Sequence, residues 1–179
     1  MTDIIRLDAK RAELHIEDLT DILCDVVDSG ASVSFLPPLP RGDARAFWRK
    51  IIAEVADGTR ILLAARIDGK LSGTVQLSYA GSPNQAHRGE VAKLLVHSRA
   101  RRRGVARALM QRLEDEALLV GRSLLTLDTR AGDAAEPLYR SMGYQFVGLI
   151  PRYARNGDGG LDATAVFYKE LGSPQPNDS

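Results

Sequence analysis

The sequence predicts a mixed α/β domain organised around one β-sheet, and three patterns in the chain support this fold class. Two alternating apolar segments flank Asp68-Gly69, a dipeptide typical of tight hairpin turns. Apolar residues recur at three- and four-residue steps after Gly104, as in an amphipathic helix. A short, two-sided apolar strand pattern follows at residues 123–128. Because the chain shows no internal repeat and no linker, we expect residues 1–171 to form one domain and residues 172–179 a disordered tail.

The composition excludes several classes of protein. The 24 basic and 23 acidic residues leave a net charge of +1, which argues against bulk affinity for nucleic acid or membranes. The longest apolar run, residues 61–65, is too short to span a bilayer, and the N-terminus lacks the apolar segment of a secretion signal. The single cysteine, Cys24, cannot form an internal disulfide, and the three histidines are too scattered to predict a metal site. We therefore expect a cytoplasmic protein without a metal centre.

The first third of the chain predicts a short strand and two helices. The strand is expected at residues 4–7, and apolar periodicity predicts a helix over residues 15–28. A second helix is expected from a cap at Asp43 to residue 56. Between the helices, residues 31–42 contain three prolines among apolar residues, and this loop is expected to cover either the core or a substrate pocket.

The rest of the chain predicts strands that alternate with two helices. One helix is expected between Gly104 and Gly121, and Asp133 is expected to cap another over residues 134–142. The predicted strands are residues 60–67, 71–79, 88–96, 123–128, 144–149 and 163–171, and residues 151–160 are expected to form a polar, glycine-rich loop.

Residues 90–106 combine a buried strand, a loop rich in arginine and a glycine that opens a long helix. This order suits a phosphate-bearing ligand, because the first N–H groups of a helix lack intrahelical partners and lie at the positive end of its dipole. Two standard nucleotide motifs are excluded. Gly69-Lys70 is followed by Leu71, where a Walker motif needs Ser or Thr. Only Gly104 is present where a Rossmann fingerprint needs three glycines.

The segment from Arg101 to Ala106, Arg-Arg-Arg-Gly-Val-Ala, matches the Arg/Gln-x-x-Gly-x-Gly/Ala signature of the GNAT superfamily of N-acetyltransferases. Leu-Leu-Val before this loop, and Leu138-Tyr139 and Gly143-Tyr144 after it, resemble further parts of the family pattern. The resemblance implies the GNAT fold, a mostly antiparallel mixed sheet of six or seven strands with about four helices, in which two splayed strands bind acetyl-CoA. It also implies a set of residues that bind this co-substrate: Leu94, Leu95, Val96, Arg101, Arg102, Arg103, Gly104, Val105, Ala106 and Arg107.

A closer resemblance is to the tabtoxin-resistance acetyltransferases, which acetylate the amine of a small, amino-acid-like β-lactam toxin. Five segments of the chain are similar to these enzymes: residues 30–36, 90–94, 127–132, 148–153 and 164–169. Because the acceptor pocket is the variable part of the superfamily, the toxin itself is a hypothesis for this chain.

The resemblance implies three catalytic residues. Glu90 and Asp128 correspond to carboxylates that act on the acceptor amine as base or anchor, and Tyr139 corresponds to a general acid beside the sulfur of CoA. Each residue also has a structural alternative. Glu90 can pair with Arg88, Asp128 can cap the turn before Gly132, and Tyr139 can simply pack in the core.

These observations predict an acetyl-CoA-dependent N-acetyltransferase that acts on the primary amine of a small molecule by direct attack in a ternary complex. A covalent acetyl-cysteine route is disfavoured, because Cys24 lies far in sequence from the ligand strand. The alternatives are an enzyme that acetylates proteins or peptides, and a CoA-binding module without catalysis. Nucleic acid and membranes are not expected partners, and the dimers common among similar proteins leave a homodimer open.

Overall fold

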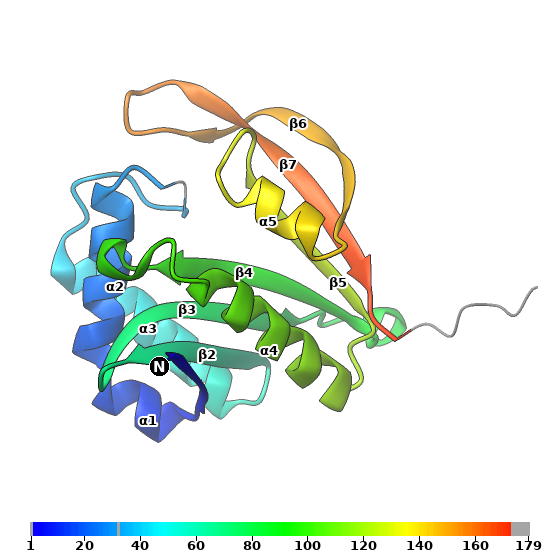
Figure 1. The fold of residues 1–179 in the computed structure, drawn as a ribbon, viewed down its shortest axis with the longest axis horizontal. Coiled ribbons are helices and arrows are strands. Elements are labelled where there is room, and N and C mark those ends of the chain that lie inside the picture. Colours follow the sequence, from blue (N-terminus) through cyan, green and yellow to red (C-terminus); the bar gives the residue numbers. More distant parts are fainter. Residues whose placement is uncertain (1, 32, 173–179) are drawn as a thin grey trace, which may run out of the picture.

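The computed structural model describes residues 2–31 and 33–172, which form a seven-stranded sheet in the order β1-β2-β3-β4-β5-β7-β6 (Figure 1). All neighbouring strands are antiparallel except β4 and β5. The predicted fold class, a mostly antiparallel mixed sheet of six or seven strands, is confirmed. The strands are β1 (Thr2–Leu7), β2 (Arg60–Ile67), β3 (Lys70–Tyr79), β4 (Arg88–Val96), β5 (Leu124–Arg130), β6 (Gln145–Arg155) and β7 (Leu161–Glu170).

Helices cover both faces of the sheet, and the side chains of β2 alternate between two cores. Ile61 and Leu63 belong to the core beneath α4, whereas Leu62 and Ala64 belong to the core beneath α2 and α3. This alternation explains why β2 is apolar along its whole length. The helices are α1 (Ala9–Leu14), α2 (Ile16–Asp28), α3 (Arg41–Ala56), α4 (Val105–Leu119) and α5 (Glu136–Ser141), with short 3-10 turns η1 (Pro83–Gln85) and η2 (Ser98–Ala100).

Two predicted helix caps were wrong. Helix α3 begins at Arg41 with Pro40 as its N-cap, so Asp43 lies inside the first turn, where a carboxylate is favoured by the helix dipole. Helix α5 begins only at Glu136, because the Asp133 carboxylate accepts a hydrogen bond from the Ala135 N–H (3.0 Å) and forms a turn ahead of the helix.

The expected loop over residues 151–160 was also wrong, because β6 continues to Arg155. Ala154 and Arg155 pair with Asp162 and Leu161 after an irregular stretch between residues 150 and 154. The connecting turn is shorter, and the Asn156 side chain closes it by accepting a hydrogen bond from the Gly160 N–H (2.8 Å). Strand β6 is therefore longer than expected, and with β7 it forms one edge of the sheet (Figure 1).

Strands β4 and β5 separate after a short parallel contact. Their pairing covers only Arg88, Gly89 and Glu90 of β4, after which β5 continues alongside β7. The remainder of β4 has β3 as its only strand neighbour among the described residues. The two strands thus diverge and leave a gap in the middle of the sheet (Figure 1).

A β-bulge lies in the part of β4 that faces this gap. Thr74 pairs with Leu95 and Gln76 with Ala92, so one residue of β3 lies opposite two residues of β4, Lys93 and Leu94. Lys93 takes a left-handed backbone conformation with φ 51°, which is uncommon for a residue with a side chain. Bulges of this kind change the direction of a side chain and are frequent beside functional sites.

Gly73 of β3 allows helix α4 to approach the sheet closely. A Cβ at Gly73 would lie 2.9 Å from the backbone oxygen of Leu95 and 3.2 Å from Cγ1 of Val105. The first turn of α4 is therefore held against β3 and β4, beside the gap.

No helix in the described part of the chain is long and apolar enough to cross a membrane. The tail predicted to be disordered, residues 172–179, lies outside the described residues except for Gly172.

Candidate active site

A cleft of about 640 Å³ occupies the gap between β4 and β5. The loop after α2 contributes residues 33–36 to its wall, and the hairpin β6–β7 contributes residues 153–155 and 162–164. Glu90, Asp128 and Tyr139 all line this cleft. The structure therefore brings together the three predicted catalytic residues, which are up to 49 positions apart in the chain.

Glu90 is the last residue of β4 that pairs with β5, so its carboxylate lies at the point where the strands separate. The side chain is exposed to the cleft. Its expected alternative partner, Arg88, instead donates hydrogen bonds to Gln85 (2.8 Å) and Thr126 (3.4 Å). Within the described residues no cation lies within 4.0 Å of the Glu90 carboxylate, which leaves it available to an ammonium group or a proton.

Asp128 of β5 is oriented by a hydroxyl group that the sequence did not reveal. The buried Thr164 of β7 donates a hydrogen bond from Oγ1 to Oδ2 of Asp128 (2.7 Å). The alternative role for Asp128, a cap on the turn before Gly132, is filled by Glu136, which accepts from the Gly132 N–H (2.6 Å). Asp128 thus keeps one carboxylate oxygen directed by Thr164 while the side chain lines the cleft.

Tyr139 of α5 is both a core residue and a cleft residue. It is 5% exposed, and its ring lies near those of Tyr144 and Phe167, at centroid distances of 5.8 and 6.0 Å. Burial raises the pKa of the Tyr139 phenol well above its ordinary value, and the nearby Asp133 and Asp128 act in the same direction. The phenol is therefore protonated at neutral pH and can act as a donor.

Lys93 and Arg130 also line the cleft, and the sequence analysis assigned no role to either. The Arg130 guanidinium is already engaged, because it lies 3.5 Å from Asp133 and 3.9 Å from Asp162 and donates to the backbone oxygen of Gly30 (3.2 Å). The Lys93 ammonium donates to Oγ of Ser34 (2.9 Å). A lone lysine inside an apolar strand pattern is a signal that could have identified Lys93.

The N-terminus of α4 has the features of an anion site. Gly104 is the N-cap with φ 76°, no side chain caps the first turn, and that turn contains no acidic residue. A Cβ at Gly104 would meet no atom within 4 Å, so the space in front of the helix is open. Arg102 and Arg103 are exposed in the preceding loop. Free N–H groups, a helix dipole and neighbouring guanidinium groups together fit a pyrophosphate.

The other residues predicted to bind the co-substrate occupy different environments. Leu94 lines the cleft, but the side chains of Leu95 and Val105 are 1% and 2% exposed and belong to the two cores. Those two residues can reach a ligand only through their backbone groups. Val96 and Ala106 are partly buried, and Arg107 donates a hydrogen bond to Ser141 (2.6 Å).

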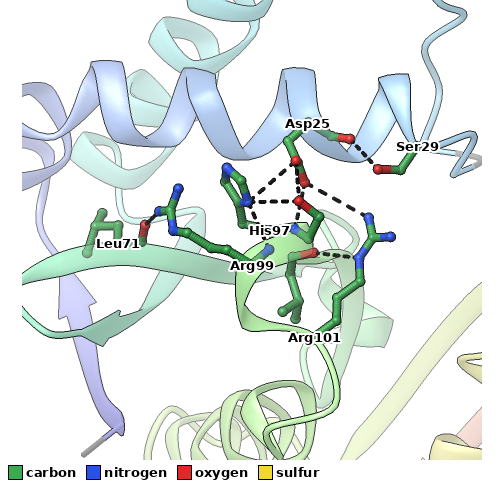
Figure 2. Close-up of polar contacts among 8 residues, drawn as sticks. Asp25, Ser29, Leu71, His97, Arg99 and Arg101 are labelled. Carbon is green, nitrogen blue, oxygen red and sulfur yellow. Dashed lines mark hydrogen bonds and ion pairs between the residues drawn. The ribbon is translucent and has the colours of Figure 1, made fainter.

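Asp25 of α2 fixes the start of the arginine-rich loop (Figure 2). Its carboxylate accepts hydrogen bonds from the backbone N–H (2.7 Å) and the hydroxyl (2.6 Å) of Ser98. The Arg101 guanidinium lies 4.0 Å from the same carboxylate and donates to the backbone oxygen of Val96 (3.3 Å). Nδ1 of His97 accepts from the Arg99 N–H (3.3 Å), and burial lowers the pKa of His97, so the imidazole is neutral. His97 therefore has a structural position.

Two contacts join the α2 side of the cleft to the side formed by β5, β7 and β6. A Cβ at Gly157, in the β6–β7 turn, would lie 3.3 Å from Pro37 of the loop after α2. Arg130 joins β5 to Gly30 at the end of α2. The two possibilities for residues 31–42 are both realised, because Phe35 packs against the core and also lines the cleft.

Residues 27–144 match the sequence model of the acetyltransferase (GNAT) family. An uncharacterized N-acetyltransferase from the hisH-hisA intergenic region of Azospirillum brasilense is 32% identical over 142 residues, which cover 76% of this chain and 82% of the relative. Among solved structures, an N-acetyltransferase from Staphylococcus aureus has a TM-score of 0.79 at 18% identity, covering 96% of this chain and 99% of that chain. A proposed acetyltransferase from Salmonella typhimurium, solved with its cofactor acetyl-CoA, has a TM-score of 0.78 at 18% identity. The match covers 100% of this chain and 99% of that chain. At such identities the structural likeness concerns the fold.

Proposed function

Because this chain belongs to the GNAT family of acetyltransferases, we propose that it transfers an acetyl group from acetyl-CoA to the primary amine of a small molecule. The family and the enzyme class predicted from the sequence are both confirmed. The observation that supports the choice of a small acceptor is the approach of the β6–β7 turn to the loop after α2 across one side of the cleft, where a Cβ at Gly157 would lie 3.3 Å from Pro37. A protein substrate would need an open groove at this place.

Acetyl-CoA is the co-substrate of the family, and the open N-terminus of α4 fits its pyrophosphate. Arg102, Arg103 and the N–H groups of the first helical turn would hold the phosphates. The free part of β4 would pair with the extended arm of the co-substrate, much as an added strand does. Acetyl-CoA supplies an acetyl thioester, whose C–S bond breaks as the new C–N bond forms.

The chemistry requires a neutral amine and a protonated leaving group, because an alkyl ammonium has a pKa near 10 and a thiol has a pKa near 8.5. Glu90 would accept the proton that the amine releases, and Asp128, directed by Thr164, would hold the amine in place. The protonated Tyr139 phenol would donate to the departing sulfur. Direct attack in a ternary complex fits best, since burial raises the pKa of the Cys24 thiol and Cys24 does not line the cleft.

The finer hypothesis is an amino-acid-like acceptor, such as the β-lactam toxin of the tabtoxin-resistance enzymes. Its support is the pattern in residues 90–94, 127–132 and 164–169, together with the cleft that these segments line.

A screen for CoA release tests the proposal. The purified chain would be assayed with acetyl-CoA against amino acids, β-lactam amines, aminoglycosides and short peptides. We expect release with at least one small amine and not with peptides. Release with peptides alone would indicate a protein acetyltransferase, and tight binding of acetyl-CoA without any release would indicate a binding module.

A further inference from the structure

Lys93 is a charged group in the candidate active site for which the reaction described above has no use. Its side chain is half-buried and lines the cleft together with Glu90 and Asp128. Within residues 2–31 and 33–172, no carboxylate oxygen lies within 4.0 Å of its ammonium nitrogen. The only partners recorded for that nitrogen in this part of the chain are the Ser34 hydroxyl, at 2.9 Å, and the Phe47 ring, whose centroid is 6.0 Å away.

The backbone holds Lys93 in this position at some cost. The left-handed φ of 51° falls on the extra residue of the β4 bulge. Such a conformation is unfavourable for a residue other than glycine, and it tends to persist where function requires it. A half-buried ammonium without a counter-ion is also unfavourable. Burial accordingly lowers the pKa of Lys93, although Asp128 and Glu90 partly restore it. Neither the strain nor the unpaired charge contributes to stability.

The charges of the cleft divide into a paired and an unpaired group. Arg130 is balanced by Asp133 and Asp162. By contrast, Glu90, Asp128, Lys93 and Arg155 have no ion-pair partner among the described residues. Arg155 lies at the outer end of β6 and donates to the backbone oxygen of Gly159 (3.4 Å). The cleft thus presents two unpaired carboxylates and, three residues from Glu90 on the same strand, one unpaired ammonium, with the Arg155 guanidinium at the end of the hairpin. A molecule that carries one cationic amine and one anionic group satisfies both.

We infer that Lys93 is a specificity-determining residue that binds an anionic group of the acceptor, so that the substrate class is a small zwitterion with a primary amine and a carboxylate. This inference rests on the proposed function, because it assigns the second half of the molecule whose amine is acetylated. Glu90 and Asp128 receive the amine, and Lys93 receives the carboxylate. Ser34 keeps the ammonium in the cleft when no acceptor is present.

The test compares each amino acid with its own carboxamide. The two molecules share the amine and the side chain, and differ in the negative charge. The wild-type chain would be assayed on a panel of such pairs, and for each pair kcat/KM for the acid would be divided by kcat/KM for the amide. The same ratio would then be measured in Lys93→Met. A charge-assisted hydrogen bond is worth about 1.5–3 kcal/mol, so we expect the ratio to fall by roughly 10- to 100-fold. The change should lie mainly in KM for the acid, and kcat/KM should fall more for each acid than for its amide.

Three further variants separate charge recognition from a structural role. Lys93→Arg keeps the charge and should retain part of the preference for the acid. Ser34→Ala removes the hydroxyl partner of Lys93 but keeps the charge, and should leave the ratio unchanged. Lys50→Met removes an exposed lysine of α3 outside the cleft and serves as the matched control.

The outcomes distinguish the inference from the proposed function. The inference would be overturned if the wild type acetylated acids and amides equally well. It would also be overturned if the ratio were unchanged in Lys93→Met. Either result would leave the proposed function intact. Failure to acetylate any small amine would overturn both. If the thermal midpoint shows that Lys93→Met does not fold, the wild-type ratio tests the substrate class and the ratio in Lys93→Arg tests the residue, and an unchanged ratio in Lys93→Arg would then overturn the assignment to Lys93.

Discussion

Two carboxylates approach the cleft from neighbouring strands, and their surroundings suit different tasks. Glu90 has no ion-pair partner in the described part of the chain, so its carboxylate is free to accept a proton. Asp128 has one oxygen bound by the Thr164 hydroxyl, which fixes its direction. An oriented carboxylate is better suited to hold a substrate, and a free one to exchange protons.

Glu90→Gln should therefore lower kcat/KM by roughly ten- to ten-thousand-fold, because the substitution removes a proton acceptor and keeps the size of the side chain. The dissociation constant of acetyl-CoA should change little. Steady-state kinetics on the acceptor found in the screen and titration with acetyl-CoA would measure the two quantities. Glu170→Gln, an exposed position outside the cleft, is the matched control. Equal turnover of Glu90→Gln and the wild type would remove Glu90 from the mechanism.

Tyr139→Phe should lower kcat by about 10²-fold, the lower end of the range for loss of a general acid. The raised pKa of Tyr139 gives a second expectation. Because burial keeps the phenol protonated beyond its ordinary pKa near 10, Tyr139 should not produce an alkaline limb in the rate profile between pH 6 and 9. The profiles of kcat against pH should then have the same shape in the wild type and in Tyr139→Phe, with a lower kcat in Tyr139→Phe at every pH. Loss of an alkaline limb in Tyr139→Phe would contradict this assignment.

Sequence reasoning reached Glu90, Asp128 and Tyr139 through the family pattern, but it could not reach their neighbours. Thr164 contacts Asp128 only because of the register of β5 and β7, in which Thr164 pairs with Arg130 two residues further on. The apolar strand around Lys93 marks this lysine as unusual, but its place in the cleft depends on a bulge, and the hydrophobic pattern does not predict a bulge. Contacts that depend on register between distant strands are tertiary properties.

At the scale of elements, local chemistry explains which predictions succeeded. The hairpin β2–β3 was predicted to within one residue because Asp68 and Gly69 have φ values of 50° and 82°, as a two-residue turn with positive φ requires. Helix α1 was missed because its six residues are too few to show a helical period, although Asp8 caps it by accepting from the Arg11 N–H (2.7 Å). The length of β6 was underestimated, since its outer residues, Ala154 and Arg155, pair with β7 after an irregular stretch that the sequence pattern does not predict.

The contact between α2 and the arginine-rich loop leads to a prediction at this scale. Asp25→Asn should raise KM for acetyl-CoA by about tenfold, because the amide keeps only one acceptor oxygen, so one of the two hydrogen bonds from Ser98 is lost and the loop is less well ordered. The kcat at saturating acetyl-CoA should remain nearly unchanged. Asp28→Asn makes the same chemical change at an exposed position of α2 and is the control.

The pH dependence of this effect follows from the pKa of Asp25. Burial alone would raise that pKa, but the two hydrogen bonds from Ser98 and the nearby His97 and Arg101 outweigh it and lower the pKa. Asp25 is therefore charged throughout the range from pH 5 to 9. The dependence of KM for acetyl-CoA on pH in this range should be the same in the wild type and in Asp25→Asn. An unchanged KM in Asp25→Asn would show that the loop is ordered without this carboxylate.

On the scale of the whole molecule, the sheet consists of two parts that share little direct pairing. Strands β1 to β4 form one part, and β5, β7 and β6 form the other. Three residue pairs join them, between Arg88–Glu90 of β4 and residues 124–126 of β5. The family resemblance predicted a sheet of six or seven strands with two splayed strands, but the extent of this separation depends on where the pairing of β4 with β5 stops. A ligand in the gap would contact both parts of the sheet.

Acetyl-CoA should accordingly stabilise the folded chain. At a concentration one hundred times its dissociation constant, a ligand that binds only the folded state contributes about 2.7 kcal/mol. For a chain of this size each kcal/mol raises the melting temperature by about 2–4 °C, so we expect a shift of roughly 5–11 °C. Differential scanning fluorimetry with increasing acetyl-CoA would measure the shift.

The same experiment tests which residues hold the phosphates. Arg102 and Arg103 are exposed and make no ion pair or side-chain hydrogen bond recorded in the described residues, so replacing both with alanine should leave the ligand-free melting temperature unchanged. The shift at a fixed acetyl-CoA concentration should fall, because two charge-assisted contacts to the phosphates are lost. Hydrogen exchange adds the location: acetyl-CoA should slow exchange in residues 91–96 of β4 and at the start of α4, and not in β1. An undiminished shift in the double variant, with protection elsewhere, would mean that the co-substrate binds outside the gap and that α4 is not its phosphate site.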